Sequence, residues 1–278
     1  MGALQQVKRL YQADKAGHTG SLDPLATGLL PICLGQATKL CGYLLDSDKR
    51  YSVRAKLGER TDSADADGKV VETSDASRVS RADLEAVLPR FAGDIRQRPP
   101  MYSALKHQGR RLYELARAGQ EVERKERAVQ IHELRPTGFE AGFFELEVRC
   151  SKGTYIRTLV EDIAAAVQQC AHVTVLRRLE AASFYQPRML SLEILMQAAG
   201  LGTAALDAFL LPSISALAGW PKVRVDGACA LNLSHGQAVR AAQAPAAGKV
   251  AIMDESGALL GIGEINPDGL VAPRRWLS

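Results

Sequence analysis

The stretch Gly17-His-Thr-Gly-Ser-Leu-Asp-Pro-Leu-Ala-Thr-Gly28 is the densest signal in this 278-residue chain. Together with residues 29–39 it contains four glycines and two prolines, which force a specific irregular path on the backbone. Pro24 restricts Asp23 to an extended conformation, so we expect its carboxylate to stand on a rigid loop, as a nucleophile or base requires. The alternative is a turn or helix-cap aspartate, since Asp is common in both places.

The composition is that of an ordinary globular protein. A hydrophobic content of 46% with 24% charged residues excludes the disordered and fibrous classes. The net charge of +4 permits an anionic partner without identifying one. Five scattered cysteines without a Cys-x-x-Cys pair indicate reduced thiols in a cytoplasmic protein. No apolar run approaches the roughly 20 residues of a membrane helix, and the chain does not start with a signal peptide.

Hydrophobic periodicity predicts helices and strands in an irregular order. Helical spacing occurs directly after Gly2, over residues 80–91 behind a Ser80 cap, and over residues 155–167. Alternating patterns predict half-buried antiparallel strands over residues 50–58, 143–148 and 173–179. Because strands and helices do not alternate regularly, the α+β class is favoured over a doubly wound fold.

The last quarter of the chain has a different pattern. Prolines and small residues over residues 211–221 suggest a linker. Beyond it, three short strands at residues 223–225, 250–252 and 259–265 are separated by Asp-Gly and Ser-Gly turns, so a small all-β module is predicted.

Two further segments have compositions that raise the question of nucleic-acid binding and of metal binding. Residues 96–127 mix many arginines and lysines with Tyr102 and Tyr113, which suits phosphate contact and base stacking but equally a solvated helical face. The aspartate-rich stretch over residues 62–68 is not a calcium loop, because serines would occupy the first and last ligand positions. A turn held by aspartate side chains is the better interpretation, and no metal site is expected.

The loop over residues 17–28 closely resembles the signature loop of TruB-type tRNA pseudouridine-55 synthases, whose aspartate is the essential catalytic residue. The resemblance continues, in the order of that family, through nearly the whole chain. Its further blocks are Leu45–Tyr51, Gly58–Gly68, Pro100–Lys106 and Cys150–Thr158.

This resemblance implies a fold and an activity. The fold would be a pseudouridine synthase domain over residues 1–212, with a mixed, mostly antiparallel sheet flanked by helices and a thumb-like insertion at about 97–127. A small β-rich, PUA-type RNA-binding domain would follow over residues 213–278. The activity would be isomerisation of uridine 55 in the T-arm of tRNA to pseudouridine by a monomer without cofactor or metal.

The resemblance also assigns site residues. Tyr51 would lie against the target uracil and serve in proton transfer from C5, whereas its residue type alone favours a packed aromatic. Arg157, otherwise a surface or phosphate-contacting cation, would pair with Asp23 and keep it ionised. The RNA-binding set would comprise His18, Tyr155, Leu176, Lys39 and Lys106.

Within that set, Tyr155 and Leu176 would pack around the uracil, and His18 would fill the space that flipped nucleotides leave. Without the resemblance, His18 would be a loop histidine bonded to its own backbone. In the C-terminal domain, Arg240, Arg274 and Arg275 would contact phosphates or be plain surface charge.

One departure from the family pattern is that no segment with Lys-Pro and Thr-Ser precedes the first helix, so the chain is expected to be shortened at its start. A non-catalytic tRNA-binding or tRNA-folding protein is therefore the alternative function. A phosphotransferase acting through an aspartyl phosphate is disfavoured, because no glycine-rich phosphate loop or metal-binding carboxylate set accompanies Asp23.

Overall fold

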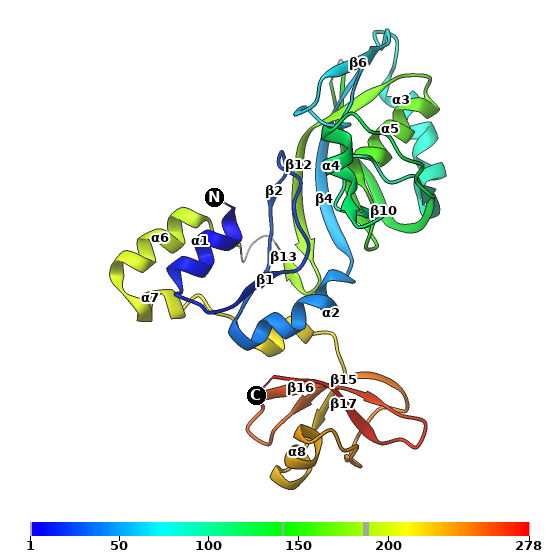
Figure 1. Ribbon diagram of the computed structural model, residues 1–278. Helices are drawn as coiled ribbons and strands as arrows, with labels where there is room; N and C mark the ends of the chain where they lie inside the picture. Colours follow the sequence, from blue (N-terminus) through cyan, green and yellow to red (C-terminus); the bar gives the residue numbers. More distant parts are fainter. Residues whose placement is uncertain (1, 141, 186–188, 278) are drawn as a thin grey trace.

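The computed structural model describes residues 2–140, 142–185 and 189–277. Its centre is a seven-stranded sheet in the order β13-β12-β4-β11-β10-β7, with β2 beside β12 (Figure 1). Every pairing in this sheet is antiparallel except the short parallel pair of β2 and β12, so the predicted mixed, mostly antiparallel sheet is confirmed. The strands are β2 (Thr27–Gly28), β4 (Lys49–Leu57), β7 (Gly93–Gln97), β10 (Arg127–Glu140), β11 (Phe143–Cys150), β12 (Ala171–Ala181) and β13 (Phe184–Tyr185).

Helices cover one face of the sheet. The helix α5 (Ile156–Ala166) buries Leu159, Val160 and Ile163 completely in the main core. The helix α3 (Arg81–Val87) begins at the predicted Ser80 cap, which forms a capping box with Asp83, and continues into the 3₁₀ turn η2 (Leu88–Phe91). Both predicted helices are therefore confirmed.

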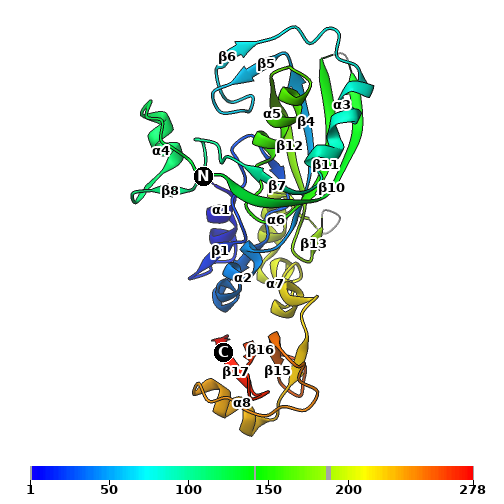
Figure 2. The ribbon, with the colours of Figure 1, turned by 90° about the vertical axis from the view of Figure 1, so that its right-hand side faces the viewer.

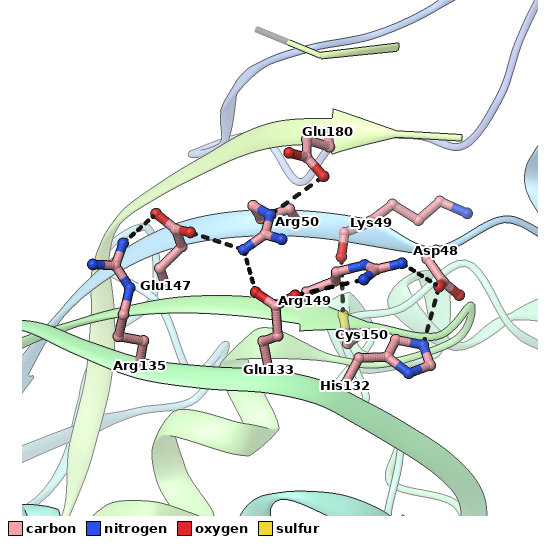
Figure 3. A network of polar contacts seen from close by, with 10 residues as sticks. All are labelled: Asp48, Lys49, Arg50, His132, Glu133, Arg135, Glu147, Arg149, Cys150 and Glu180. Atoms are coloured by element: carbon pink, nitrogen blue, oxygen red, sulfur yellow. Dashed lines mark hydrogen bonds and ion pairs between the residues drawn. The ribbon is translucent and has the colours of Figure 1, made fainter. Parts of the chain in front are cut away.

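The opposite face of the sheet is charged. Strand alternation directs Arg50 of β4 away from the core, where its guanidinium lies 2.7 Å from Glu133, 2.9 Å from Glu147 and 3.3 Å from Glu180 (Figure 3). These partners belong to β10, β11 and β12. Single exposed ion pairs contribute little, but this arginine joins four strands and thereby helps to fix their register.

A helical group stands beside the sheet (Figure 1). The helix α1 (Ala3–Leu10), predicted directly after Gly2, packs Val7 against Leu195 and Leu206. These two leucines come from α6 (Leu192–Leu201) and α7 (Thr203–Asp207). After α1, the chain passes through the hairpin of β1 (Ala16–His18) and β3 (Ile32–Leu34), the 3₁₀ turn η1 (Gly35–Leu40) and α2 (Cys41–Leu45).

Two hairpins extend from this body. The first consists of β5 (Glu59–Thr61) and β6 (Val70–Thr73) and encloses the aspartate-rich turn. The second consists of β8 (Lys106–His107) and β9 (Arg110–Arg111), followed by α4 (Leu112–Arg117). Figure 2 shows β8 and α4 projecting away from the sheet, so the segment expected to form a thumb is an excursion between β7 and β10.

The C-terminal part contains its own four-stranded sheet. Its strands are β14 (Lys222–Arg224), β15 (Gly248–Met253), β16 (Leu259–Ile265) and β17 (Val271–Trp276). The expectation of an all-β module was wrong, because α8 (Gly227–Ser234) lies between β14 and β15. The Asp226 side chain caps this helix by accepting a 2.7 Å hydrogen bond from the Cys229 N–H.

The stretch expected to be a linker connects the two parts and also packs against both. Its 3₁₀ turn η4 (Ser213–Leu217) places Leu217 in a fully buried position. The core around Leu217 combines Leu40 and Leu44 of the first part with Ile262 and Leu277 of the last. The two parts are therefore joined by a shared apolar core. Within the described ranges, no helix has the length and apolar character that crossing a membrane requires.

Candidate active site

The loop between β1 and β3 carries Asp23 at the edge of the large sheet. The Asp23 carbonyl accepts a 2.9 Å hydrogen bond from the Ala26 N–H, which closes a turn around Pro24. Immediately after this turn, Gly28 runs parallel to β12 with a φ of +99°, a conformation that favours glycine. A Cβ at Gly28 would lie 2.2 Å from the carbonyl oxygen of Arg178. The glycine is therefore required for the loop to reach β12.

We expect Gly28→Ala to lower the free energy of unfolding by about 1–3 kcal/mol for the overlap and by about 1 kcal/mol more for the left-handed backbone. The matched control is Gly35→Ala, since Gly35 has a φ of +54° but no neighbour within 4 Å of the added atom. Only the backbone penalty should apply there. Urea unfolding of both variants measures the difference, and equal losses would contradict this account of Gly28.

A buried arginine holds the Asp23 carboxylate at both oxygens. Arg157, the second residue of α5, has a side chain that is 4% exposed. Its Nε lies 2.9 Å from Oδ2 of Asp23, and its Nη2 donates a 3.1 Å hydrogen bond to Oδ1. This two-point contact fixes the direction of the carboxylate as well as its position. The structure thus brings together two of the residues that the sequence singled out.

Arg157 also binds two other segments through its Nη atoms. Its Nη1 donates to the Ser63 carbonyl at 2.8 Å and lies 3.3 Å from Oδ2 of Asp65, and its Nη2 donates to the Tyr102 carbonyl at 2.7 Å. One guanidinium therefore joins the Asp23 loop, the aspartate-rich turn and the base of the projecting hairpin.

The aspartate-rich turn is held by its own side chains, as predicted. Oδ1 of Asp65 accepts hydrogen bonds from the Ser63 hydroxyl and the Asp67 N–H, and Asp62 accepts one from the Lys69 N–H. In the part of the chain that the structure describes, no three His, Cys, Asp or Glu side chains are grouped so that they could hold a metal ion.

Burial and the neighbouring arginines shift the pKa of Asp23 in opposite directions. Burial raises the pKa of the Asp23 carboxyl above its ordinary value, and the nearby Asp65 raises it further, while Arg157 and Arg178 lower it. Burial outweighs the arginines, so the net pKa shift is upward. Arg157 favours the ionised form of Asp23, as expected, but offsets only part of the effect of burial on its pKa.

Two phenols lie near the carboxylate. Tyr51 of β4 packs against the main core, and burial raises the pKa of its phenol while Arg178 opposes that shift. Tyr155 precedes α5, and burial likewise raises its pKa. The charge of Asp23 contributes to the raised pKa of both phenols, so both lie within electrostatic range of the carboxylate. Leu176 is 4% exposed in the same core cluster against which Tyr51 packs.

The other expected RNA-binding residues have varied surroundings. His18 accepts a 3.1 Å hydrogen bond at Nδ1 from the Gly20 N–H, which is the loop-histidine arrangement. The Lys39 ammonium donates to the Trp276 carbonyl at 2.8 Å and so contacts the C-terminal sheet rather than the Asp23 loop. Lys106 is exposed on the projecting hairpin.

Sequence reasoning did not single out three residues that build the site. Asp65 contacts Arg157, as described above, and Gln97 uses its side-chain amide to bind both the N–H and the carbonyl of Tyr155, at 3.0 and 3.2 Å. Arg178 is only 1% exposed and binds the Asp23 loop. One signal was available, because Arg178 lies two residues after the core residue Leu176 and so shares its strand face, where a charge is unusual.

Comparison with solved structures identifies chains of the same fold. A Cbf5–Nop10–Gar1 complex contains a chain with a TM-score of 0.77 and 23% identity, covering 99% of this chain and 80% of that one. An H/ACA RNP bound to a substrate RNA containing 2′-deoxyuridine gives a TM-score of 0.73 and 20% identity over 99% and 80%. This chain therefore shares the fold of these chains over nearly its whole length.

Sequence comparison identifies the family to which the chain belongs. Residues 8–156 match the TruB family pseudouridylate synthase N-terminal domain, residues 157–218 the tRNA pseudouridylate synthase B C-terminal domain, and residues 221–277 the C-terminal domain of pseudouridine synthase II TruB. The tRNA pseudouridine synthase B proteins of Pseudomonas putida (strain GB-1) and Nitrosococcus oceani are 53% and 52% identical over 276 residues, covering 99% of this chain and 90% of theirs. The chain belongs to the TruB family of pseudouridylate synthases.

Proposed function

We propose that this chain isomerises uridine 55 in the T-arm of tRNA to pseudouridine, with Asp23 as the nucleophile. The observation that carries the proposal is a carboxylate on a rigid loop, held at both oxygens by the buried Arg157. Two phenols, Tyr51 and Tyr155, lie within electrostatic range of it. The relatives named tRNA pseudouridine synthase B support the choice of substrate.

The proposed reaction gives each group a task. Asp23 attacks the uridine or its sugar, the glycosidic bond breaks, and the freed uracil rotates and rejoins the ribose through C5. Arg157 orients the ionised carboxylate, and Tyr51 serves in the transfer of the proton that leaves C5. Tyr155 and Leu176 pack around the uracil, and His18 occupies space that the extruded nucleotide leaves. Substrate and product are isomers, so the step needs no redox partner.

We further propose that the chain is a cytoplasmic monomer that binds tRNA through exposed cations. Lys106, Arg110 and Arg117 are exposed on the projecting segment and supply phosphate contacts from a thumb. Among the three C-terminal cations, Arg274 is paired with Glu264 at 2.9 Å, which leaves Arg240 and Arg275 as the better phosphate contacts of a PUA-type domain. The free cysteines in the described residues accord with a reducing compartment.

The test is release of tritium from C5-labelled uridine in a tRNA transcript. Release should be lost when uridine 55 alone is replaced by cytidine, while the affinity for the transcript is retained. Undiminished release from the cytidine transcript would contradict the position. No release from the unmodified transcript, despite tight binding, would favour the non-catalytic tRNA-binding alternative.

We expect Tyr51→Phe to lower the single-turnover rate by about 100-fold or more, because general acid-base groups contribute on that scale. The dissociation constant for tRNA should stay nearly constant, since the ring is retained. Tyr43→Phe is the matched control, because Tyr43 packs against Trp220 at the junction of the two parts. Equal effects of the two substitutions would remove Tyr51 from proton transfer.

We expect Lys106→Ala to weaken tRNA binding and to reduce the slope of log affinity against log salt by about 0.7–0.9, the value for one released counterion. The rate at saturating enzyme should be unchanged, since Lys106 lies on the projecting hairpin. The exposed Arg90 at the end of η2 provides a control substitution to alanine. An unchanged salt slope for the Lys106 variant would show that the projecting hairpin does not contact phosphate through this residue.

A further inference from the structure

A second buried arginine, Arg178, organises the backbone of the Asp23 loop. Its Nε donates to the Leu29 carbonyl at 2.7 Å, its Nη2 to the Gly20 carbonyl at 3.0 Å and its Nη1 to the Ser21 carbonyl at 3.5 Å. One guanidinium therefore grips the loop on both sides of Asp23. The Arg178 carbonyl also accepts a 2.8 Å hydrogen bond from the Leu29 N–H.

The same arginine is paired with Tyr51 on the adjacent strand. In the antiparallel pair of β12 and β4, Arg178 is the register partner of Tyr51, so the two side chains are neighbours on the core face. The cation of Arg178 acts on both proposed reacting groups, since it lowers the pKa of the Tyr51 phenol and of the Asp23 carboxyl against the effect of burial.

The energetics of Arg178 argue against a purely stabilising role. Its side chain is almost completely buried, and none of the ion pairs found among the described residues includes it. Desolvating a guanidinium is costly, and backbone carbonyls alone compensate poorly for a missing counter-charge. An apolar side chain of similar size would fill the position at a lower cost, but it would bind neither the loop carbonyls nor the phenol.

We propose that Arg178 is a positioning residue that fixes the Asp23 loop and the Tyr51 phenol in one reactive arrangement. This inference rests on the proposed function. The two arginines have different roles. Arg157 orients the carboxylate, while Arg178 holds the loop that carries the carboxylate and aligns that loop with the Tyr51 phenol. In this role Arg178 acts through the loop carbonyls and the Tyr51 phenol, which makes it a positioning residue and not a catalytic one.

The test compares Arg178→Lys with the matched substitution Arg177→Lys. Arg177 is the preceding residue of β12, points to the other face and contacts the same loop through the Thr27 hydroxyl at 3.3 Å. We expect Arg178→Lys to lower the single-turnover rate of tritium release by about 100-fold, the scale of a misplacement of about 1 Å. The dissociation constant for tRNA should change by less than about threefold, and Arg177→Lys should leave both quantities within about twofold of the parent.

A double substitution distinguishes a positioning role from a purely structural one, because it measures how the rate cost of Arg178→Lys depends on Tyr51. If Arg178 acts through Tyr51, Arg178→Lys should cost much less in the Tyr51→Phe background than in the parent. Arg178→Met, which keeps the volume and removes the charge, serves as the second variant if the lysine variant does not fold.

The outcomes separate the inference from the proposed function. A parent-like rate for Arg178→Lys would overturn the positioning role and leave the proposed function intact. So would a loss of rate that is accompanied by a large loss of tRNA affinity and a large fall in melting temperature. So would failure of both Arg178 variants to fold, because the residue would then serve the fold only. An inactive parent chain would overturn the proposed function, and the inference with it.

Discussion

Replacing Asp23 by asparagine is expected to lower the single-turnover rate of tritium release by about four orders of magnitude or more, the scale on which covalent nucleophiles contribute. Asparagine keeps the shape of the side chain and can still accept a hydrogen bond from Arg157, but it provides no carboxylate to attack the uridine or its sugar. The loop is held through its backbone, so its path should not depend on this side chain.

The control for this prediction is the affinity of the variant for tRNA. Because Asp23 is one side chain in a large surface, the dissociation constant should remain close to that of the parent. Melting temperatures of the two proteins should also agree closely. Tritium release by the asparagine variant at the parent rate would refute the catalytic assignment.

Replacing Arg157 by methionine is expected to reduce both activity and stability. Removing one partner of a buried ion pair costs about 3–5 kcal/mol, because the remaining charge is left unpaired. Here Asp65 would be left buried at 4% exposure of its side chain, and the Ser63 and Tyr102 carbonyls would lose a donor. Urea unfolding measures this loss, and an unchanged free energy of unfolding would show that the contacts of Arg157 carry no weight in the fold.

The pH dependence of the Arg157→Met variant gives an independent readout. The folded-state pKa of Asp23 is already raised by burial, so the rate should fall as the pH drops through that pKa and the carboxylate becomes protonated. Without Arg157 the same pKa rises further, and the fall in rate moves to higher pH. Single-turnover rates across the neutral and acidic range measure this displacement, and a displacement to lower pH would contradict the role assigned to Arg157.

The fold could be predicted where one residue pattern decided one element. Helix α5 and strands β4, β11 and β12 carry clear periodicity, and all four were expected. Strand β10 was not, because Glu133, Arg135 and Pro136 obscure its alternation, and the charged residues find their partners only on neighbouring strands. Helix α8 was missed because it is short and its apolar residues lack a marked face.

The site could be predicted where a short block of sequence carried the signal. Asp23, Tyr51 and Arg157 lie in such blocks, and the structure brings Arg157 to Asp23. Arg178 could not be predicted in the same way, because its role depends on the register of β12 against β4 and on the parallel contact with β2. Lys39 shows the converse, since the family resemblance assigned it to RNA binding while its ammonium binds the Trp276 carbonyl.

The shared apolar core at the junction has a consequence for recognition. Leu217, Ile262 and Leu277 are buried together with Leu40 and Leu44, so separating the two parts would expose a continuous apolar surface to water. Hinge motion at this joint is therefore costly, and the spacing between the Asp23 loop and the C-terminal sheet is fixed. We therefore expect an RNA that contacts both to match that spacing, so that the length and bend of a folded RNA would affect how tightly it binds.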